Sequence, residues 1–270
     1  VLATVGGSVA FSGAVAAANT STSWDATVNG TAQTATYNGS GTSADPYEID
    51  SLVDLQAIGK NGTTRGYHYE LVADIDAGET TNWNGGAGFA PLGGDDDFDI
   101  KFTGEFDGNN HSIDKLHIDR PSAVFIGLFG VTSSNANVSN VQLTNVNVTS
   151  GGYVGSLIGH NSGNISNVYV SGEVTKSSGQ NYAGGVIGQA KAGDISDVYA
   201  VVTVSGEANS QVGGLIGGVE GGSINRSATT GTVTAPGINE VGGLVGSLRG
   251  GAVNNSYSSA SVTGNDQVGG

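Results

Sequence analysis

The sequence predicts an all-β fold: a parallel β-helix (β-solenoid) with about three short strands per 29-residue coil and one short N-terminal capping helix. Three observations lead to this prediction. Glycine is the commonest residue, with 47 of 270, yet no collagen-like G-X-Y period is present, so the glycines serve turns or close backbone stacking. Val, Ile and Leu recur in short runs between turn residues, and one Gly-containing segment repeats at a nearly fixed interval.

The repeated segment reads FIGLFG at 125–130, YVGSLIG at 153–159, YAGGVIG at 182–188, QVGGLIG at 211–217, EVGGLVG at 240–246 and QVGG at 267–270. Alignment on Ile126, Gly155, Gly184, Gly213, Gly242 and Gly269 gives four spacings of 29 residues and a last one of 27. Two further apolar columns accompany it: Val138, Ile165, Ile195, Ile224 and Val253, then Val148, Val174, Val204, Val233 and Val262. Repeated glycine pairs argue against helical repeats, and three strands in each unit fit one coil of a β-helix.

The chain divides into four segments. Residues 1–18 are apolar and uncharged; they are typical of a signal peptide ending at Ala16-Ala17-Ala18, or of a retained strand that pairs with a neighbouring subunit. Residues 19–44 are rich in Ser, Thr and Asn and are expected to form a linker. Residues 45–123 supply the N-terminal cap and the first irregular coils, and residues 124–270 supply the regular repeats.

One short helix is expected within the N-terminal cap. In residues 51–58, SLVDLQAI, Leu52, Leu55 and Ile58 share one helical face, with Asp50 or Ser51 as the N-cap and Gly59 as the stop. Such a helix would cover the open core and unpaired strand edges at the end of a solenoid. Strands are expected at 68–75, 100–106 and 111–118.

The repeats resemble the GLUG motif. The resemblance rests on the segments at 213–217 and 242–246, GGLIG and GGLVG, each followed by a glycine pair and a short polar strand. Upstream, DPYEI at 45–49, FTGEFDGN at 102–109 and GLFG at 127–130 are similar to the start of such solenoids, so the resemblance covers roughly residues 45–270. It implies a large surface protein of bacteria or archaea, such as an adhesin or the non-catalytic part of a surface peptidase, in which the repeats act as a scaffold.

The composition indicates which partners are disfavoured and in which environment the protein works. A formal charge of −15 disfavours binding to nucleic acid, whose phosphates need a basic surface. Abundant Asp and scarce Lys are typical of a halophilic protein, because high salt screens the repulsion within an acidic surface; an ordinary acidic secreted protein is the alternative. The chain contains no cysteine, which excludes disulfides and thiol chemistry.

No catalytic site is expected, and calcium is the only cofactor considered. The run of Asp95, Asp96, Asp97 and Asp99 offers hard oxygen ligands for calcium, although a solvated acidic loop explains it as well. The segment DGNN at 107–110 lacks the other ligands of a calcium loop and is interpreted as a turn. The four histidines have no metal-ligand spacing, and acidic residues vary from coil to coil, whereas a glycosidase needs two carboxylates facing each other across a cleft.

Ten sequons make the chain a candidate glycoprotein. The acceptor asparagines are Asn19, Asn29, Asn38, Asn61, Asn110, Asn137, Asn147, Asn164, Asn225 and Asn254.

The leading functional interpretation is a secreted, non-enzymatic, structural or adhesive solenoid of the cell surface, whose partners are itself, other surface components or glycans. Head-to-tail polymerisation of the chain into a filament is a further hypothesis. The candidate subunit contacts are Val9, Phe11, Val15, Gln267, Val268, Gly269 and Gly270. The alternatives are a carbohydrate-binding or carbohydrate-cleaving β-helix, and the scaffold region of a larger surface enzyme. Trp24 and Trp83 lie outside the repeats, which disfavours the carbohydrate alternatives.

Overall fold

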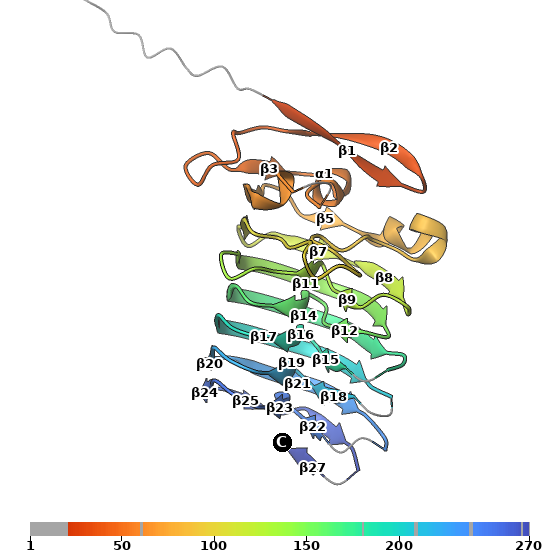
Figure 1. The fold of residues 1–270 in the computed structure, drawn as a ribbon, viewed down its shortest axis with the longest axis vertical. Helices are drawn as coiled ribbons and strands as arrows, with labels where there is room; N and C mark the ends of the chain where they lie inside the picture. Colours follow the sequence, from red (N-terminus) through yellow and green to blue (C-terminus); the bar gives the residue numbers. More distant parts are fainter. Residues whose placement is uncertain are drawn as a thin grey trace, which may run out of the picture.

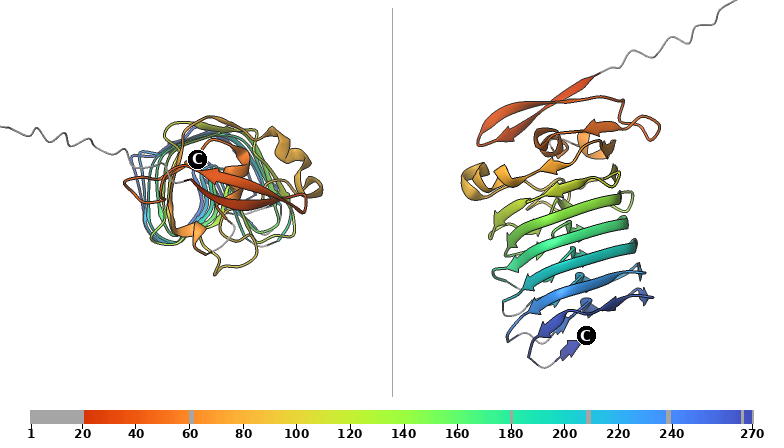
Figure 2. Two further views of the ribbon diagram at one scale, coloured as in Figure 1. Left: turned by 90° about the horizontal axis from the view of Figure 1, so that it is seen from above. Right: turned by 180° about the vertical axis from the view of Figure 1, so that it is seen from behind.

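A computed structural model confirms the β-solenoid (Figure 1). It describes residues 21–59, 62–179, 181–207, 210–237, 240–265 and 267–269. The coils stack along one axis, and they superimpose in the view along that axis (Figure 2). The strands of successive coils pair in parallel, so equivalent positions in the repeat lie one above another, about 4.8 Å apart.

Three parallel sheets form the walls of the solenoid. The five-stranded sheet consists of β10 (Phe129–Val131), β13 (Ile158–Asn161), β16 (Ile187–Ala190), β19 (Ile216–Val219) and β23 (Val245–Leu248). The six-stranded sheet consists of β9 (Phe125–Ile126), β12 (Tyr153–Val154), β15 (Tyr182–Gly184), β18 (Gln211–Gly213), β22 (Glu240–Gly242) and β27 (Gln267–Gly269).

The third wall, which we call the long sheet, has 14 strands. Its early members are β3 (Tyr47–Ile49), β4 (His68–Leu71), β5 (Ile75–Asp76), β6 (Glu105–Asp107), β7 (Ser112–Asp114) and β8 (His117–Arg120). Its later members are β11 (Asn137–Ser150), β14 (Asn164–Lys176), β17 (Asp194–Ser205), β20 (Ser223–Asn225), β21 (Ala228–Thr234), β24 (Ala252–Asn254), β25 (Tyr257–Ser258) and β26 (Ser261–Thr263).

The second and third apolar columns follow the expected register. Ile195 pairs with Ile165 and Ile224, and Val204 pairs with Val174 and Val233. In the middle coils, however, both columns lie on one long strand (β11, β14 or β17) rather than on two short strands. The strand bends where one residue, such as Asp197, has a positive φ of 56°, so a single strand follows the corner of the coil without a separate turn.

The first column needs a correction at its N-terminal end. Ile126 pairs with Val154, not with Gly155. The residues stacked in the core are therefore Ile126, Val154, Ala183, Val212 and Val241, all 2% exposed or less. Alternation along a strand places the aliphatic residue inside and its glycine neighbour on the other face, so the glycine spacing of 29 residues does not extend back to Ile126.

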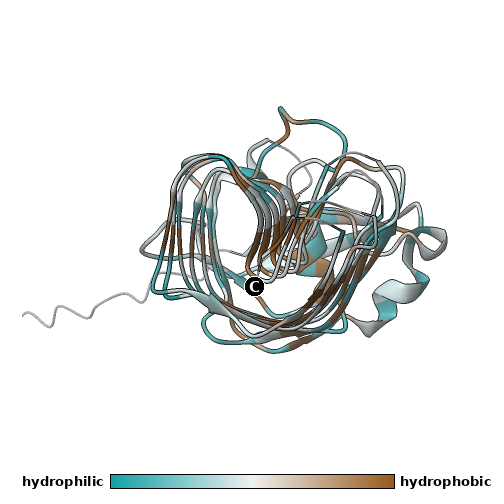
Figure 3. Cartoon of the chain, turned by 90° about the horizontal axis from the view of Figure 1, so that it is seen from below, coloured by the Kyte–Doolittle hydropathy of each residue, from teal (hydrophilic) through white to brown (hydrophobic). Residues whose placement is uncertain are grey.

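The core fills the interior of the coils from Leu55 at the capped end to Leu244 near the other end. Figure 3 views the coils from the C-terminal side, with hydrophobic segments superimposed from one coil to the next. Because each inward position repeats, a large aliphatic side chain packs against its equivalents in the coils on either side. The result is one continuous apolar column rather than separate cores.

The expected helix caps the N-terminal end. Helix α1 (Leu52–Ala57) begins after Ser51, whose Oγ accepts a hydrogen bond from the Asp54 amide at 3.2 Å. Leu55 and Ile58 are fully buried, so the apolar face covers the first coils. Two 3-10 helices that the sequence did not suggest follow, η1 (Thr64–Gly66) and η2 (Gly78–Gly86). The strand expected at 100–106 is reduced to β6, because Phe102 forms only an isolated bridge with Thr132.

The segment expected as a linker contains an ordered hairpin instead. Strands β1 (Thr22–Val28) and β2 (Thr31–Tyr37) pair in antiparallel register around a turn at Asn29-Gly30. The ring of Trp24 lies 4.7 Å from that of Tyr37 and 5.0 Å from that of Tyr47, measured between centroids. This aromatic cluster attaches the hairpin to the first coil, which explains why a segment rich in Ser and Thr folds here.

Candidate functional site

The outer face of the long sheet presents ladders of polar side chains. Thr149, Thr175, Ser205, Thr234 and Thr263 form one such ladder, with partners in successive coils. Parallel stacking gives each outward position the same neighbours above and below, so hydroxyl and amide groups repeat at the rung spacing. The ladders are therefore regular and hydrophilic.

An asparagine ladder runs along the first corner of the long sheet. The corner residues Asn140 and Asn167 have φ angles of 56° and 52°, a left-handed conformation that asparagine tolerates better than most residues. Asn167 Nδ2 donates to Asn140 Oδ1 at 2.7 Å, and Asn140 Nδ2 donates to Asp107 Oδ1 at 2.8 Å. In the next two coils Arg226 and Asp197 replace the amides with a bidentate ion pair at 2.7 and 2.8 Å.

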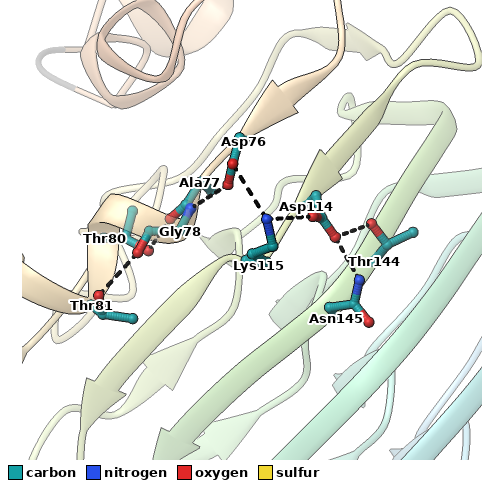
Figure 4. Close-up of polar contacts among 9 residues, drawn as sticks. All are labelled: Asp76, Ala77, Gly78, Thr80, Thr81, Asp114, Lys115, Thr144 and Asn145. Carbon is teal, nitrogen blue, oxygen red and sulfur yellow. Dashed lines mark hydrogen bonds and ion pairs between the residues drawn. The ribbon is translucent and has the colours of Figure 1, made fainter.

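A second polar ladder lies at the next corner, in the early coils (Figure 4). Lys115 Nζ lies 3.3 Å from carboxylate oxygens of both Asp76 and Asp114. Asp114 Oδ1 also accepts from Thr144 Oγ1 and from Asn145 Nδ2, each at 2.7 Å. These hydrogen bonds lower the pKa of Asp114, and the two carboxylates raise the pKa of Lys115. The charged groups are thus used to hold neighbouring coils together.

Carboxylates also stack directly in the first coils. Glu70 pairs in register with Glu48 on one side and with Asp107 on the other. Burial, and then the charges of Glu48 and Asp107, raise the pKa of Glu70. Irregular coil lengths hide this column in the sequence. In the described part of the chain, no group of three or more His, Cys, Asp or Glu side chains is placed to hold a metal ion.

Two aromatic columns lie outside the core, and sequence reasoning missed both. In the six-stranded sheet Phe125, Tyr153 and Tyr182 stack with ring centroids 5.3 and 5.8 Å apart. His160, only 6% exposed, lies edge-on to this column, and burial lowers its pKa to about 4. The first column could have been predicted from the sequence, because an aromatic residue begins each of the repeated segments FIGLFG, YVGSLIG and YAGGVIG.

The second aromatic column lies on the outer face of the long sheet. Tyr169, Tyr199, Ala228 and Tyr257 occupy one register position in four successive coils. The rings of Tyr169 and Tyr199 are 6.0 Å apart, whereas Ala228 leaves a gap between Tyr199 and Tyr257. Tyr199 is 42% exposed although a coil lies on either side of it, and an exposed aromatic ring favours a role in binding.

One buried lysine is held by the backbone. Lys176 Nζ donates to the carbonyl oxygens of Gly151 and Ser178. Burial lowers the pKa of Lys176 to about 8. These carbonyls satisfy the ammonium group, which indicates a structural clamp on the turn after β14.

The structure places the carboxylates of the calcium candidates among hydrogen-bonding partners of the protein. Asp95 Oδ2 lies 3.3 Å from Arg120 Nη1, and Asp96 Oδ1 accepts from the Val124 amide at 3.0 Å. Asp97 Oδ1 accepts from the amide of Asp99 at 2.9 Å. The contacts of Asp95 and Asp96 fasten the acidic loop to residues 120–124, and each of the first three carboxylates has a partner within the protein.

Several of the candidate acceptor asparagines lie on strands of the long sheet, where Asn137 pairs in register with Asn164, and Asn225 with Asn254. Asn29, Asn38, Asn110, Asn147, Asn164 and Asn254 are exposed, and Asn137 and Asn225 are half-buried. Asn19 and Asn61 lie outside the described residues, as do the contact candidates Val9, Phe11, Val15 and Gly270. Gln267, Val268 and Gly269 form β27, which pairs with β22, and Val268 is 43% exposed.

Comparisons with known proteins agree with the repeat pattern. The model of the GLUG motif matches residues 150–175. Halomucin of Haloquadratum walsbyi is 46% identical over 175 residues, which cover 63% of this chain and 2% of halomucin. A protein of Evansella cellulosilytica described as a Gly-rich membrane protein is 38% identical over 135 residues, which cover 49% of this chain and 15% of that protein. The chain thus spans only a small part of either relative.

A solved structure of an IgA1 protease shares the architecture. It superimposes with a TM-score of 0.57 over 89% of this chain and 18% of the protease chain, at 21% identity. A similarity at this level of identity shows a common fold and nothing about activity. No helix among the described residues has the length and apolar character needed to cross a membrane.

Proposed function

We propose that this chain, which belongs to the GLUG-repeat family, forms a stiff, non-enzymatic segment of a larger cell-surface protein. The observation that carries the proposal is the parallel, in-register pairing of successive coils, which stacks the apolar columns from rung to rung with one register shift between β11 and β14. A solenoid of this kind bends little, because bending would break hydrogen bonds along a whole wall. Such a rod suits a spacer or scaffold that carries other parts of a protein away from the cell.

The surface chemistry supports an extracellular, salt-rich setting. The acidic composition, with a net charge of −15, keeps a protein soluble where salt screens charge repulsion. The similarity to halomucin, from Haloquadratum walsbyi, supports the same setting. The outer face of the long sheet carries polar ladders and exposed tyrosines. We propose that this face is adhesive.

Head-to-tail assembly stays a separate prediction. Helix α1 and the hairpin β1–β2 cover one end of the solenoid. A second copy could not extend the three walls across the capped end unless the hairpin moved. Sedimentation analysis at high salt, on the full chain and on a chain that lacks residues 21–44, would show whether copies associate and whether the hairpin limits their association.

Labelling of intact cells tests the surface location. A membrane-impermeant amine reagent should modify Lys115 and Lys191, both more than half exposed, before the cells are lysed, while a cytoplasmic marker stays unlabelled. Modification only after lysis would refute the proposal.

Removal of one coil tests the scaffold role. Deleting residues 182–210 as a unit should leave a folded but shorter rod, because each coil contacts only its neighbours. The matched control deletes half of that coil and should unfold the protein, since the register of the remaining columns is lost. Electron microscopy of the cell envelope then shows whether rod length affects the surface layer; an envelope that does not change would contradict a spacer role.

A further inference from the structure

Strands β17, β21 and β25 follow one another in the long sheet (Figure 1). A hollow of about 360 Å³ opens on their outer face. Tyr199 and Tyr257 form two of its walls, and Ala228, in register between them, forms its floor. Asp197 and Arg226 line the rim, together with Asn255. The hollow exists because one coil carries alanine where the coils on either side carry tyrosine.

The size of this gap fits a single ring. Tyr199 and Tyr257 are two rungs apart, which is about 10 Å along the axis. Tyr169 and Tyr199, which are one rung apart, have their ring centroids 6.0 Å from each other. A flat ring that rested on Ala228 would therefore contact both tyrosines at close to the spacing that the column already uses.

The rim determines which ring suits the hollow. Asp197 and Arg226 form a bidentate pair at 2.7 and 2.8 Å, and their side chains are 45% and 60% exposed. A carboxylate, a guanidinium and an amide beside aromatic rings match a pyranose, which has an apolar C–H face for stacking and neighbouring hydroxyls that both donate and accept hydrogen bonds. A purely apolar ring would leave the rim unused, and an anionic ligand would meet Asp197 and a chain of net charge −15.

We propose that this hollow binds one residue of a neutral saccharide, stacked between Tyr199 and Tyr257 and hydrogen-bonded by Asp197, Arg226 and Asn255. The open, shallow shape fits a unit within a longer glycan as well as a terminal sugar. Each such contact would be weak, and display on a rigid cell-surface rod would let several act together. The site would give the outer face of the solenoid a specific adhesive function, which the scaffold role alone does not require.

Saturation-transfer NMR on the whole chain at high salt tests the proposal. The probes are the methyl pyranosides of glucose, galactose and mannose, N-acetylglucosamine, and glucuronate as the anionic comparison. At least one neutral sugar should receive saturation, and its titration should shift tyrosine ring resonances. Absence of binding by every neutral probe, or binding of glucuronate alone, would overturn the proposal.

Variants locate the site. Tyr199→Ala and Tyr257→Ala should each weaken binding about tenfold, which corresponds to about 1.4 kcal/mol. Ala228→Tyr should abolish binding while it keeps or raises the unfolding temperature, because it completes the tyrosine column. The matched control, Tyr169→Ala, removes a ring from the same column outside the hollow and should leave affinity unchanged. Undiminished binding to the folded Ala228→Tyr protein, or equal losses in the control, would place the sugar elsewhere.

Discussion

Replacement of His160 by glutamine should remove much of the acid sensitivity of this solenoid. His160 is 6% exposed and packs edge-on against the rings of Phe98 and Phe125. Its Nδ1 atom is buried and makes no hydrogen bond to the described residues. Gln189 occupies the same register position in the next coil, so the repeat itself shows that glutamine fits there.

The magnitude follows from the pKa. Burial, the largest cause, lowers the pKa of His160 from 6.5 to about 4; the charges of Lys191 and Lys101 act in the same direction, and Glu220 opposes them. Because the folded-state pKa lies below the unfolded value, the unfolded chain takes up a proton first as the pH falls. The stability is therefore complete above pH 6.5 and decreases toward pH 4, by about 2 kcal/mol at pH 5 and about 3 kcal/mol at pH 4.

Urea unfolding between pH 7 and pH 4 at constant high salt measures this loss. The free energy of unfolding of wild type should fall more steeply than that of His160→Gln, and the difference between the two should grow by about 2 kcal/mol from pH 7 to pH 5. The control is His117→Gln, which changes a histidine that is half-buried in an irregular coil. Parallel pH profiles for wild type and His160→Gln would show that the buried imidazole does not cause the acid sensitivity.

Two further predictions concern the carboxylate column and the repeated glycines. Glu70→Gln should raise the free energy of unfolding at neutral pH by roughly 0.5 kcal/mol at low salt and by less at molar salt, because a raised folded-state pKa makes the ionised carboxylate destabilising. Calorimetry measures this gain, and the control is Glu173→Gln, whose register partners Asn147 and Thr203 carry no charge. An equal gain in the control would count against the prediction. Gly213→Ala should lower the free energy of unfolding by about 2 kcal/mol or more, since its Cβ would lie 2.0 Å from the carbonyl oxygen of Ile216. Gly237 has open space around it and a φ of +78°, so Gly237→Asn should change the free energy of unfolding, measured in guanidinium, by less than about 0.5 kcal/mol. A comparable loss of stability at both positions would disprove the role of close backbone approach.

The capping helix and the hairpin differ in how far the sequence could predict them. Residues 51–58 carry their own signals, an N-cap serine and apolar residues on one helical face, so the helix was predictable. The hairpin has a turn signal at Asn29-Gly30, but its stability comes from Trp24 packing on tyrosines of β3 and of the segment that precedes β4. Those contacts join segments distant in the chain, which local composition does not reveal.

The repeat pattern predicts the architecture and most of the stacking. In an in-register parallel solenoid a repeat along the chain becomes a column in space, so the pairing of Ile195 with Ile165 and Ile224 could be read from the period. The folded chain was needed to show where Ile126 pairs, that Glu48, Glu70 and Asp107 stack, and that Ala228 opens a hollow between two tyrosines. This difference arises because the turns accommodate insertions and deletions. Backbone hydrogen bonding across the walls fixes which residues lie on adjacent rungs, whatever number of residues separates them along the chain.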